Sequence, residues 1–194
     1  MHNKKTKFHK GRYVYNKTTI AEHLSRIDQN GTVTEYEIRK LVPKVRDFFI
    51  ACDLVKCSRD FRLMKYFIKL IFETQGNRCG LWLQTREGEI NSVWNNPGNE
   101  YNHWHSNWIS YEVDHVEPVN AGGGECLTNA QFLSPNANRF IKCSLTNDQL
   151  LRRIDLSDRL KDRIREVQKK RQELFNSQTW HDFIDLVDEI ENTK

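Results

Sequence analysis

The chain has 194 residues, of which 38% are hydrophobic and 29% are charged. This composition suits one compact domain with helical additions and argues against a disordered chain. No apolar run approaches the roughly 18 residues that a membrane-spanning helix needs, and the basic N-terminus lacks the apolar stretch of a signal peptide. We therefore expect a cytoplasmic protein.

The cysteines form no recognisable metal or disulfide pattern. Their number is odd, their spacings are irregular, and no Cys-x-x-Cys pair occurs among Cys52, Cys57, Cys79, Cys126 and Cys143. A secreted disulfide scaffold would be shorter and denser in cysteine. We expect reduced thiols and no structural zinc.

Positive charge is concentrated in two segments of a chain whose net charge is +4. Residues 1–17 contain no acidic residue and six basic ones, which are Lys4, Lys5, Lys7, Lys10, Arg12 and Lys17. A second basic block spans residues 159–171, whereas residues 181–194 are mainly acidic. Such blocks suit a polyanion such as nucleic acid, although a solvated tail and a solvated helix face would give the same pattern.

The first 75 residues are expected to be mainly helical. Residues 20–27 follow two threonines that could cap a helix, and Gly31 ends that stretch. Thr34 and Glu37 have the spacing of a capping box ahead of further apolar positions. Helices at 19–27 and 37–45 could form a helix-turn-helix, but paired short helices are common and the signal is weak.

Two features refine this helical region. Pro43 predicts a kink or a break in the second helix. Further along, residues 61–73 have an apolar stripe at helical spacing that should pack inward, formed by Leu63, Tyr66, Phe67, Leu70 and Ile71.

After Gly76 the pattern changes from helix to strand. Residues 79–94 alternate like a strand pair with a turn near Gly88, and residues 109–119 read as another strand. From Leu145 onward the chain returns to helix, with candidate starts at Thr146, Ser157 and Thr179. We expect an α+β fold, mainly helical with a small antiparallel sheet, in three regions: 1–75, 76–145 and 146–194.

The central stretch YEVDHVEPVNAGGGECLTN, residues 111–129, places Asp114 and His115 at the end of a strand. Three glycines at 122–124 allow a tight reversal, and Asn129 then opens a second alternating stretch. Pro135 suits the first turn of a helix that carries Asn138. The expected order is strand, glycine-rich loop, strand, helix.

This arrangement resembles the HNH, or ββα-metal, nucleases, in which a DH pair, an Asn and a helical His or Asn surround one divalent metal. Asn129 follows His115 by 14 residues, and Asn138 follows Asn129 by 9. These intervals, with VDHxxP before them and NR after them, are also similar to the HNH domain of RNA-guided nucleases. The resemblance covers about residues 110–143 and implies a single-metal site that cleaves phosphodiesters.

The chemistry of the residues agrees with that implication. His115 suits a general base, because its pKa is normally near neutrality. Asp114 and the Asn138 side-chain oxygen are hard ligands that suit one Mg²⁺, with Mn²⁺ or another divalent ion as an alternative. Asn129 is expected to hold the loop and orient His115. Arg139 and Lys142 on the helix could clamp phosphates.

The sequence also departs from the commonest family pattern. Many relatives hold a structural zinc with two Cys-x-x-Cys pairs, and the second pair is replaced here by Ser134 and Ala137. Cys79 stands upstream without a cysteine partner. The flanking helices and a tryptophan cluster could supply a core instead, and that cluster is formed by Trp82, Trp94, Trp104 and Trp108.

Two further sets of side chains suggest minor roles. Glu112 should share a strand face with Asp114, from which it could assist through a water. His103 and His105 could form a metal pair, but nothing near them in the sequence completes a site, and a loop or substrate contact is favoured.

The resemblance implies a metal-dependent endonuclease of restriction, homing or phage type, acting in the cytoplasm of a bacterial or phage-infected cell. Its partner would be double-stranded DNA, with the basic N-terminal arm along the backbone and a homodimer for double-strand cleavage. Two alternatives stay open at this point. One is a non-catalytic DNA-binding regulator on a degenerate HNH scaffold, and the other is an HNH ribonuclease or toxin.

Overall fold

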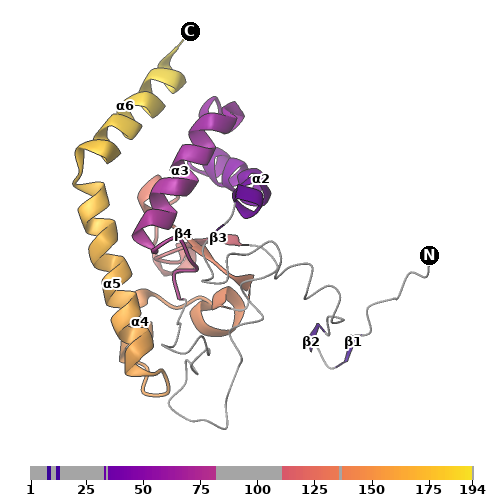
Figure 1. The fold of residues 1–194 in the computed structure, drawn as a ribbon, viewed down its shortest axis with the longest axis vertical. Coiled ribbons are helices and arrows are strands. Elements are labelled where there is room, and N and C mark those ends of the chain that lie inside the picture. Colours follow the sequence, from indigo (N-terminus) through magenta and orange to yellow (C-terminus); the bar gives the residue numbers. More distant parts are fainter. Residues whose placement is uncertain are drawn as a thin grey trace.

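The structure, a computed structural model, describes residues 8–9, 12–13, 33, 35–81, 111–135 and 137–193. Helices form most of the described chain and surround a small antiparallel hairpin, so the fold is α+β as the sequence predicted (Figure 1). One hydrophobic core includes side chains from Ile38 to Val187. All three predicted regions therefore contribute to the same core.

Helix α2 (Glu35–Ala51) buries one face at helical spacing, through Ile38, Leu41, Val42, Val45, Phe48 and Phe49. Pro43 lies inside this helix, and the helix continues past it without a break. Pro43 has no N–H to donate to the backbone carbonyl four residues earlier in the helix. Because Pro43 is exposed, water can reach that carbonyl and bind it instead. The buried side chains on both sides of Pro43 hold the helix against the core.

Helix α3 (Phe61–Thr74) follows the short 3₁₀ turn η1 (Cys57–Arg59). The Asp60 side chain caps it by accepting hydrogen bonds from the backbone N–H groups of Arg62 and Leu63, at 2.8 and 3.0 Å. Four of the five predicted stripe residues are buried, namely Leu63, Phe67, Leu70 and Ile71. Tyr66 remains 39% exposed, although its ring contacts Phe183.

Strands β3 (Glu112–His115) and β4 (Ala130–Leu133) form the central antiparallel hairpin, as the sequence predicted. Asp114 lies opposite Gln131, and His115 lies opposite Ala130. Because side chains alternate along a strand, the hairpin has two different faces. Phe132 lies on the face covered by α3, where its ring centroid is 4.8 Å from that of Phe72.

The other face of the hairpin meets a helical segment, η6 (Ala137–Lys142). It is a π-helix, in which the Cys143 N–H donates to the Asn138 carbonyl five residues earlier, at 2.7 Å. Cys143 ends it with a positive φ of 46°. The strand–strand–helix order is as predicted, but the helix is wider than an α-helix, a rare form that often occurs at functional sites.

Three helices complete the chain: α4 (Asn147–Arg152), α5 (Asp158–Phe175) and α6 (Gln178–Asn192). Thr146 and Ser157 cap the first two, as predicted. The third cap is Ser177 rather than the predicted Thr179, with the Ser177 Oγ accepting from the Trp180 N–H at 3.3 Å. Figure 1 shows α5 and α6 as one long column beside the rest of the chain.

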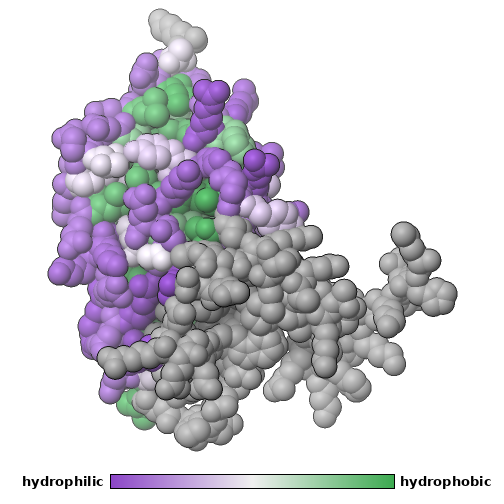
Figure 2. All heavy atoms as spheres, viewed as in Figure 1, coloured by the Kyte–Doolittle hydropathy of each residue, from purple (hydrophilic) through white to green (hydrophobic). Residues whose placement is uncertain are grey.

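The basic block at 159–171 lies on α5, and several of its charges are paired along the helix. Glu166 binds both Arg163 and Lys170, at 3.2 and 2.7 Å, and Asp162 binds Arg165 at 2.7 Å. Figure 2 shows a largely hydrophilic surface on this side of the molecule. These pairs favour a solvated helix face over a dedicated polyanion site in this segment.

Near the N-terminus, β1 (Phe8–His9) pairs with β2 (Arg12–Tyr13). Several predictions lie outside the described residues: the helix at 20–27 with its helix-turn-helix, most of the strand pair at 79–94, and the four tryptophans. Among the helices that the structure describes, none has both the length and the apolar character needed to cross a membrane.

Candidate metal and nuclease site

Asp114 lies on the hairpin face that meets η6. Its Oδ2 accepts a hydrogen bond from Nε2 of Gln131, its partner across the hairpin, at 2.7 Å. Burial raises the pKa of the Asp114 carboxyl, and the Gln131 hydrogen bond and the nearby Lys142 and His115 offset part of that rise. A half-buried carboxylate in this environment is a candidate ligand for a cation.

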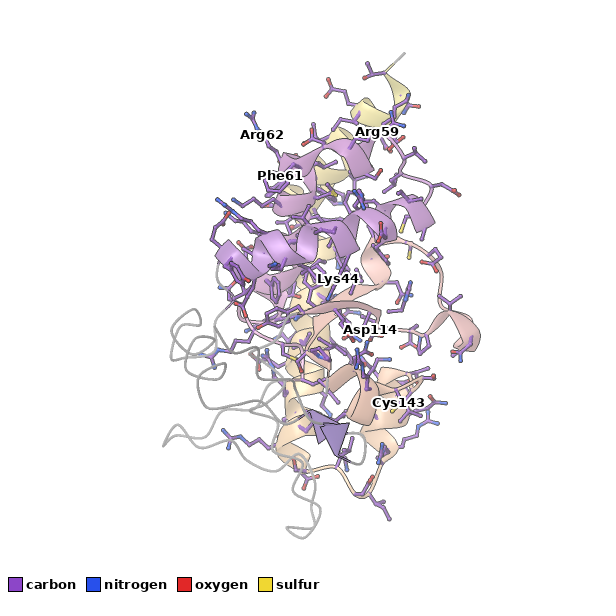
Figure 3. All side chains as sticks on the ribbon, turned by 90° about the vertical axis from the view of Figure 1, so that its right-hand side faces the viewer. Lys44, Arg59, Phe61, Arg62, Asp114 and Cys143 are labelled. Carbon is purple, nitrogen blue, oxygen red and sulfur yellow. The ribbon has the colours of Figure 1, made fainter. Side chains whose placement is uncertain are left out.

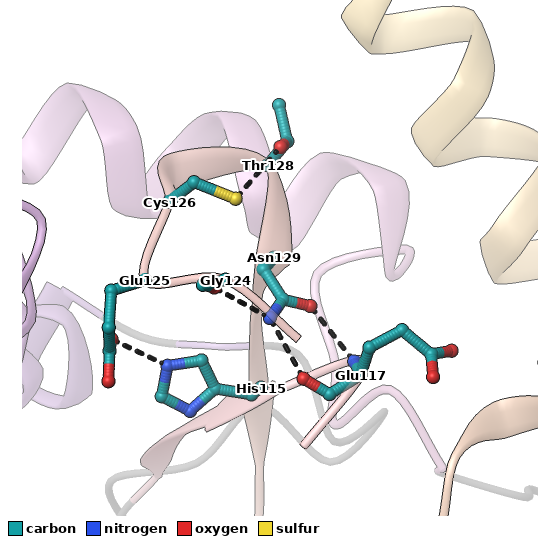
Figure 4. Close-up of polar contacts among 7 residues, drawn as sticks. All are labelled: His115, Glu117, Gly124, Glu125, Cys126, Thr128 and Asn129. Atoms are coloured by element: carbon teal, nitrogen blue, oxygen red, sulfur yellow. Dashed lines mark hydrogen bonds and ion pairs between the residues drawn. The ribbon is translucent and has the colours of Figure 1, made fainter. Parts of the chain in front are cut away.

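His115 is the last residue of β3, and its side chain lies on the opposite face. The imidazole packs against Phe48 of α2, with ring centroids 5.5 Å apart. Its Nε2 lies 2.8 Å from Oε2 of Glu125 (Figure 4). Asp114 and His115 therefore do not face each other along the strand. They can reach a common ligand only at the end of the strand, where His115 is the terminal residue.

Asn129 holds the loop that joins the two strands. Its Oδ1 accepts from the Glu117 N–H at 2.9 Å, and its Nδ2 donates to the carbonyls of Glu117 and Gly124, both at 2.9 Å. Its own carbonyl accepts from the Val116 N–H at 2.8 Å. The side-chain contacts, drawn in Figure 4, are those of a residue that fixes the loop, and its part in catalysis stays a prediction.

Asn138 and Arg139 face β3 from η6 and share one carboxylate. Asn138 Nδ2 donates to Oε2 of Glu112 at 3.1 Å, and an Arg139 guanidinium nitrogen donates to the other oxygen, Oε1, at 2.8 Å. The bond to Glu112 occupies the amide nitrogen of Asn138. Its side-chain oxygen is therefore the atom available to a cation, as a metal ligand requires.

Lys142, which was predicted to clamp phosphates, lies inside the fold. Its side chain is fully buried, and its ammonium group donates to the Leu145 carbonyl. Burial lowers the pKa of Lys142, and the neighbouring Asp114 opposes that shift. Lys142 lies four residues after Asn138, so both face the hairpin. It lies beside Asp114 inside the fold.

A second lysine, which the sequence did not single out, reaches the site from α2. Lys44 Nζ donates to the Tyr111 carbonyl at 2.6 Å, just before β3 begins. Burial lowers the pKa of Lys44, while the charge of Glu112 raises it and that of Arg139 lowers it further. Figure 3 shows Lys44 and Asp114 towards the middle of the molecule, and Arg59, Phe61 and Arg62 at its upper end. Cations from α2 and η6 therefore surround the carboxylates of β3.

The side chains on these elements offer oxygen donors of the kinds that bind a hard divalent ion. Asp114 offers a carboxylate, Asn138 an amide oxygen, and Glu112 a second carboxylate on the same strand face. Within the described ranges, no three side chains of the His, Cys, Asp and Glu types gather to hold a metal by themselves. A site here would thus use the amide oxygen and would leave positions for water and phosphate.

The positions where the HNH resemblance would place zinc ligands are filled by direct packing. Cys79 is buried, and its sulfur accepts from the Ser134 N–H at 3.3 Å and lies 3.7 Å from Ser134 Oγ. The Ala137 N–H donates to the same hydroxyl at 3.3 Å. Burial raises the pKa of the Cys79 thiol, which disfavours the thiolate that zinc needs.

The structure does not describe the side chains of the other predicted site residues. The side chains of Lys4, Lys5, Lys7, Lys10 and Arg12, and the pair His103 and His105, lie outside the described residues. Three contributors were not apparent from the sequence: Lys44, Glu125 and Gln131. Gln131 could have been found from the strand register, but a single glutamate in a glycine-rich loop carries no pattern.

Comparison with protein-family models, with curated proteins and with solved structures gives no match for this chain. Its function is therefore inferred from the residues and their geometry.

Proposed function

We propose that the protein is a metal-dependent endonuclease of the HNH type, which hydrolyses DNA phosphodiester bonds. The observation that supports this most is the placement of Asp114 and Asn138 on facing elements, β3 and η6, with His115 at the end of the same strand. Each of the three residue types suits one step of phosphodiester hydrolysis, and each lies on the element that the HNH resemblance assigns to it.

In this proposal, His115 takes a proton from water while the water oxygen forms a bond to phosphorus and the bond to the 3′ oxygen breaks. The departing oxygen receives its proton from solvent. Asp114 and the Asn138 oxygen would hold the divalent ion, Mg²⁺ or Mn²⁺, which when bound would neutralise charge on the phosphate. Arg139, whose side chain is 57% exposed, contacts a neighbouring phosphate.

Three cations lie among the carboxylates of the hairpin: Lys44 and Arg139 are close to Glu112, and Lys142 is close to Asp114 and Glu117. Arg139 is the exposed one of the three that a phosphate could reach. In the proposal, the basic residues of the N-terminal segment track the DNA backbone. A homodimer would cut both strands, whereas a monomer would nick. The setting would be a bacterial or phage-infected cytoplasm.

The direct test is cleavage of supercoiled plasmid with Mg²⁺ or Mn²⁺, with EDTA as a control. His115→Ala should abolish cleavage, because no other proposed group takes the proton. His181→Ala is the matched control, since His181 is an exposed histidine on α6. Cleavage that survives His115→Ala, or DNA binding without cleavage in any divalent ion, would exclude the proposal. The second result would instead support a DNA-binding regulator.

The same preparation should be offered structured and single-stranded RNA. Cleavage of RNA but not of plasmid, again lost in His115→Ala, would assign the site to a ribonuclease or toxin. The proposal predicts that DNA is the preferred substrate.

A further inference from the structure

We propose that Glu125 is a positioning residue for His115. Its carboxylate holds the imidazole through Nε2, so that Nδ1 is the nitrogen that accepts the proton from water. The inference rests on the proposed function for its catalytic consequence, but the contact itself can be tested without substrate.

The contact fixes where the imidazole proton lies. Glu125 Oε2 and His115 Nε2 are 2.8 Å apart, and the two side chains are 39% and 25% exposed. A neutral imidazole donates from one nitrogen and accepts at the other, whereas a carboxylate only accepts. The proton must therefore be on Nε2. Nδ1 makes no hydrogen bond with the part of the chain that the structure describes, so its lone pair is available.

The orientation of the ring is fixed from a second direction. Phe48 of α2 packs against the imidazole with an interplanar angle of 56°. The Phe48 ring on one side and the Glu125 carboxylate at Nε2 leave the imidazole ring little freedom to rotate. A base held in this way needs little reorganisation when a phosphodiester arrives.

Hydrogen bonds within the glycine-rich loop hold Glu125 next to His115. The Gly124 carbonyl, immediately before Glu125, is held by Asn129 Nδ2 at 2.9 Å. The carbonyl of Cys126, immediately after it, accepts from the Asn129 N–H at 2.9 Å. Asn129 therefore ties the chain on both sides of Glu125, and Figure 4 shows the bond to Gly124. The loop thus carries an acidic side chain back to the end of β3.

The first test is NMR of the full-length protein without metal or DNA, at about pH 8, where imidazole is normally neutral. In the wild type, the Nε2 proton of His115 should be visible and slow to exchange with water. Glu125→Ala should lose that signal, whereas Glu125→Gln should keep it, because the Gln amide oxygen can still accept. Backbone amide spectra check that both variants are folded. A proton on Nδ1 in the wild type, or an unchanged signal in Glu125→Ala, would overturn the inference.

The second test measures plasmid cleavage by the same variants. Glu125→Ala should lower kcat about 100-fold, as expected for a misplaced catalytic group, with little change in KM. Glu125→Gln should keep most of the wild-type kcat. Wild-type rates in Glu125→Ala would overturn the inference while leaving the nuclease proposal intact. If the wild type cleaves nothing, the nuclease proposal fails, and the NMR result alone decides whether Glu125 fixes the imidazole.

Discussion

Asn129 and Glu117 are joined by two hydrogen bonds, one in each direction. The Glu117 N–H donates to Asn129 Oδ1, and Asn129 Nδ2 donates to the Glu117 carbonyl, both at 2.9 Å. An amide side chain can accept at its oxygen while it donates from its nitrogen. Asn129 is 8% exposed, and its hydrogen bonds to Glu117 and Gly124 are partly buried. The geometry of the loop between β3 and β4 depends on this pairing.

Replacing Asn129 by Asp should therefore destabilise the protein, although the two side chains have the same shape. A carboxylate cannot donate to the carbonyls of Glu117 and Gly124, and the loss of these two partly buried hydrogen bonds costs about 1–3 kcal/mol. Urea unfolding measures the change. Asn192→Ala, which removes one exposed bond to the Asp188 carbonyl, should change the free energy of unfolding by less than about 0.5 kcal/mol. Equal stability of Asn129→Asp and the wild type would contradict this role.

The glycines of the loop are not equivalent. A Cβ at Gly123 would lie 1.9 Å from the Glu117 carbonyl oxygen, whereas a Cβ at Gly124 would meet only the Cys126 sulfur, at 3.9 Å. Gly123→Ala should force the loop open, with a loss of about 1–3 kcal/mol and of any activity that needs His115 in place. Gly124→Ala should leave both nearly unchanged. Thermal unfolding and plasmid cleavage of this pair test the prediction, which fails if the two variants behave alike.

Much of the site's framework could be predicted from the sequence because it is local. The alternation around Asp114 predicts β3, and Thr146 and Ser157 mark helix starts through their own side-chain chemistry. The three glycines predict a tight reversal between the strands. The start of α6 was predicted at Thr179 rather than at Ser177, because serine and threonine are both good N-cap residues. The helix begins after Ser177, and Trp180, Phe183 and Val187 of this helix are buried.

What the sequence did not predict depends on contacts between distant elements. Lys44 reaches β3 from α2, and Glu125 reaches His115 across a loop, and neither position carries a periodic signal. Pro43 predicted an interruption, but tertiary packing keeps α2 continuous. The burial of Lys142 could have been foreseen, since a residue four positions after Asn138 faces the same way.

Arg139 should contribute one phosphate contact. Its matched control is Arg165 on α5: both side chains are 57% exposed, and each is paired with one carboxylate, Glu112 and Asp162 respectively. Arg139→Ala should weaken binding to duplex DNA in EDTA and reduce the salt dependence of log Kd by about one unit of slope. Arg165→Ala should leave the slope unchanged. Fluorescence anisotropy over a range of salt concentrations measures both, and an equal slope for the wild type and Arg139→Ala would exclude the contact.

Asp114 should make stability depend on pH in a defined direction. Burial raises its pKa above the ordinary value of 3.8, so the folded protein binds more protons than the unfolded chain just above that pH. The cost of the buried carboxylate is absent at low pH and grows as the pH rises through the folded-state pKa. Without metal, Asp114→Asn should therefore gain stability relative to the wild type as the pH rises from 3.8 towards neutrality.

Asp155 provides the control, because its ion pair with Arg153 lowers its pKa. Its stabilising contribution is lost only as the pH falls below 3.8, so Asp155→Asn should track the wild type between that pH and neutrality. Urea unfolding at several pH values measures all three proteins. If the free energies of unfolding of Asp114→Asn and the wild type differ by the same amount at every pH, burial of the charged Asp114 carboxylate does not affect stability.

The central claim is that Asp114 and Asn138 hold one divalent ion beside His115. Anomalous diffraction from crystals soaked with Mn²⁺ tests it most directly. The account predicts a single peak about 2 Å from an Asp114 carboxylate oxygen and from Asn138 Oδ1, absent in crystals of Asp114→Ala. No peak between these side chains, or a peak bound elsewhere with Asp114 and Asn138 turned apart, would contradict it.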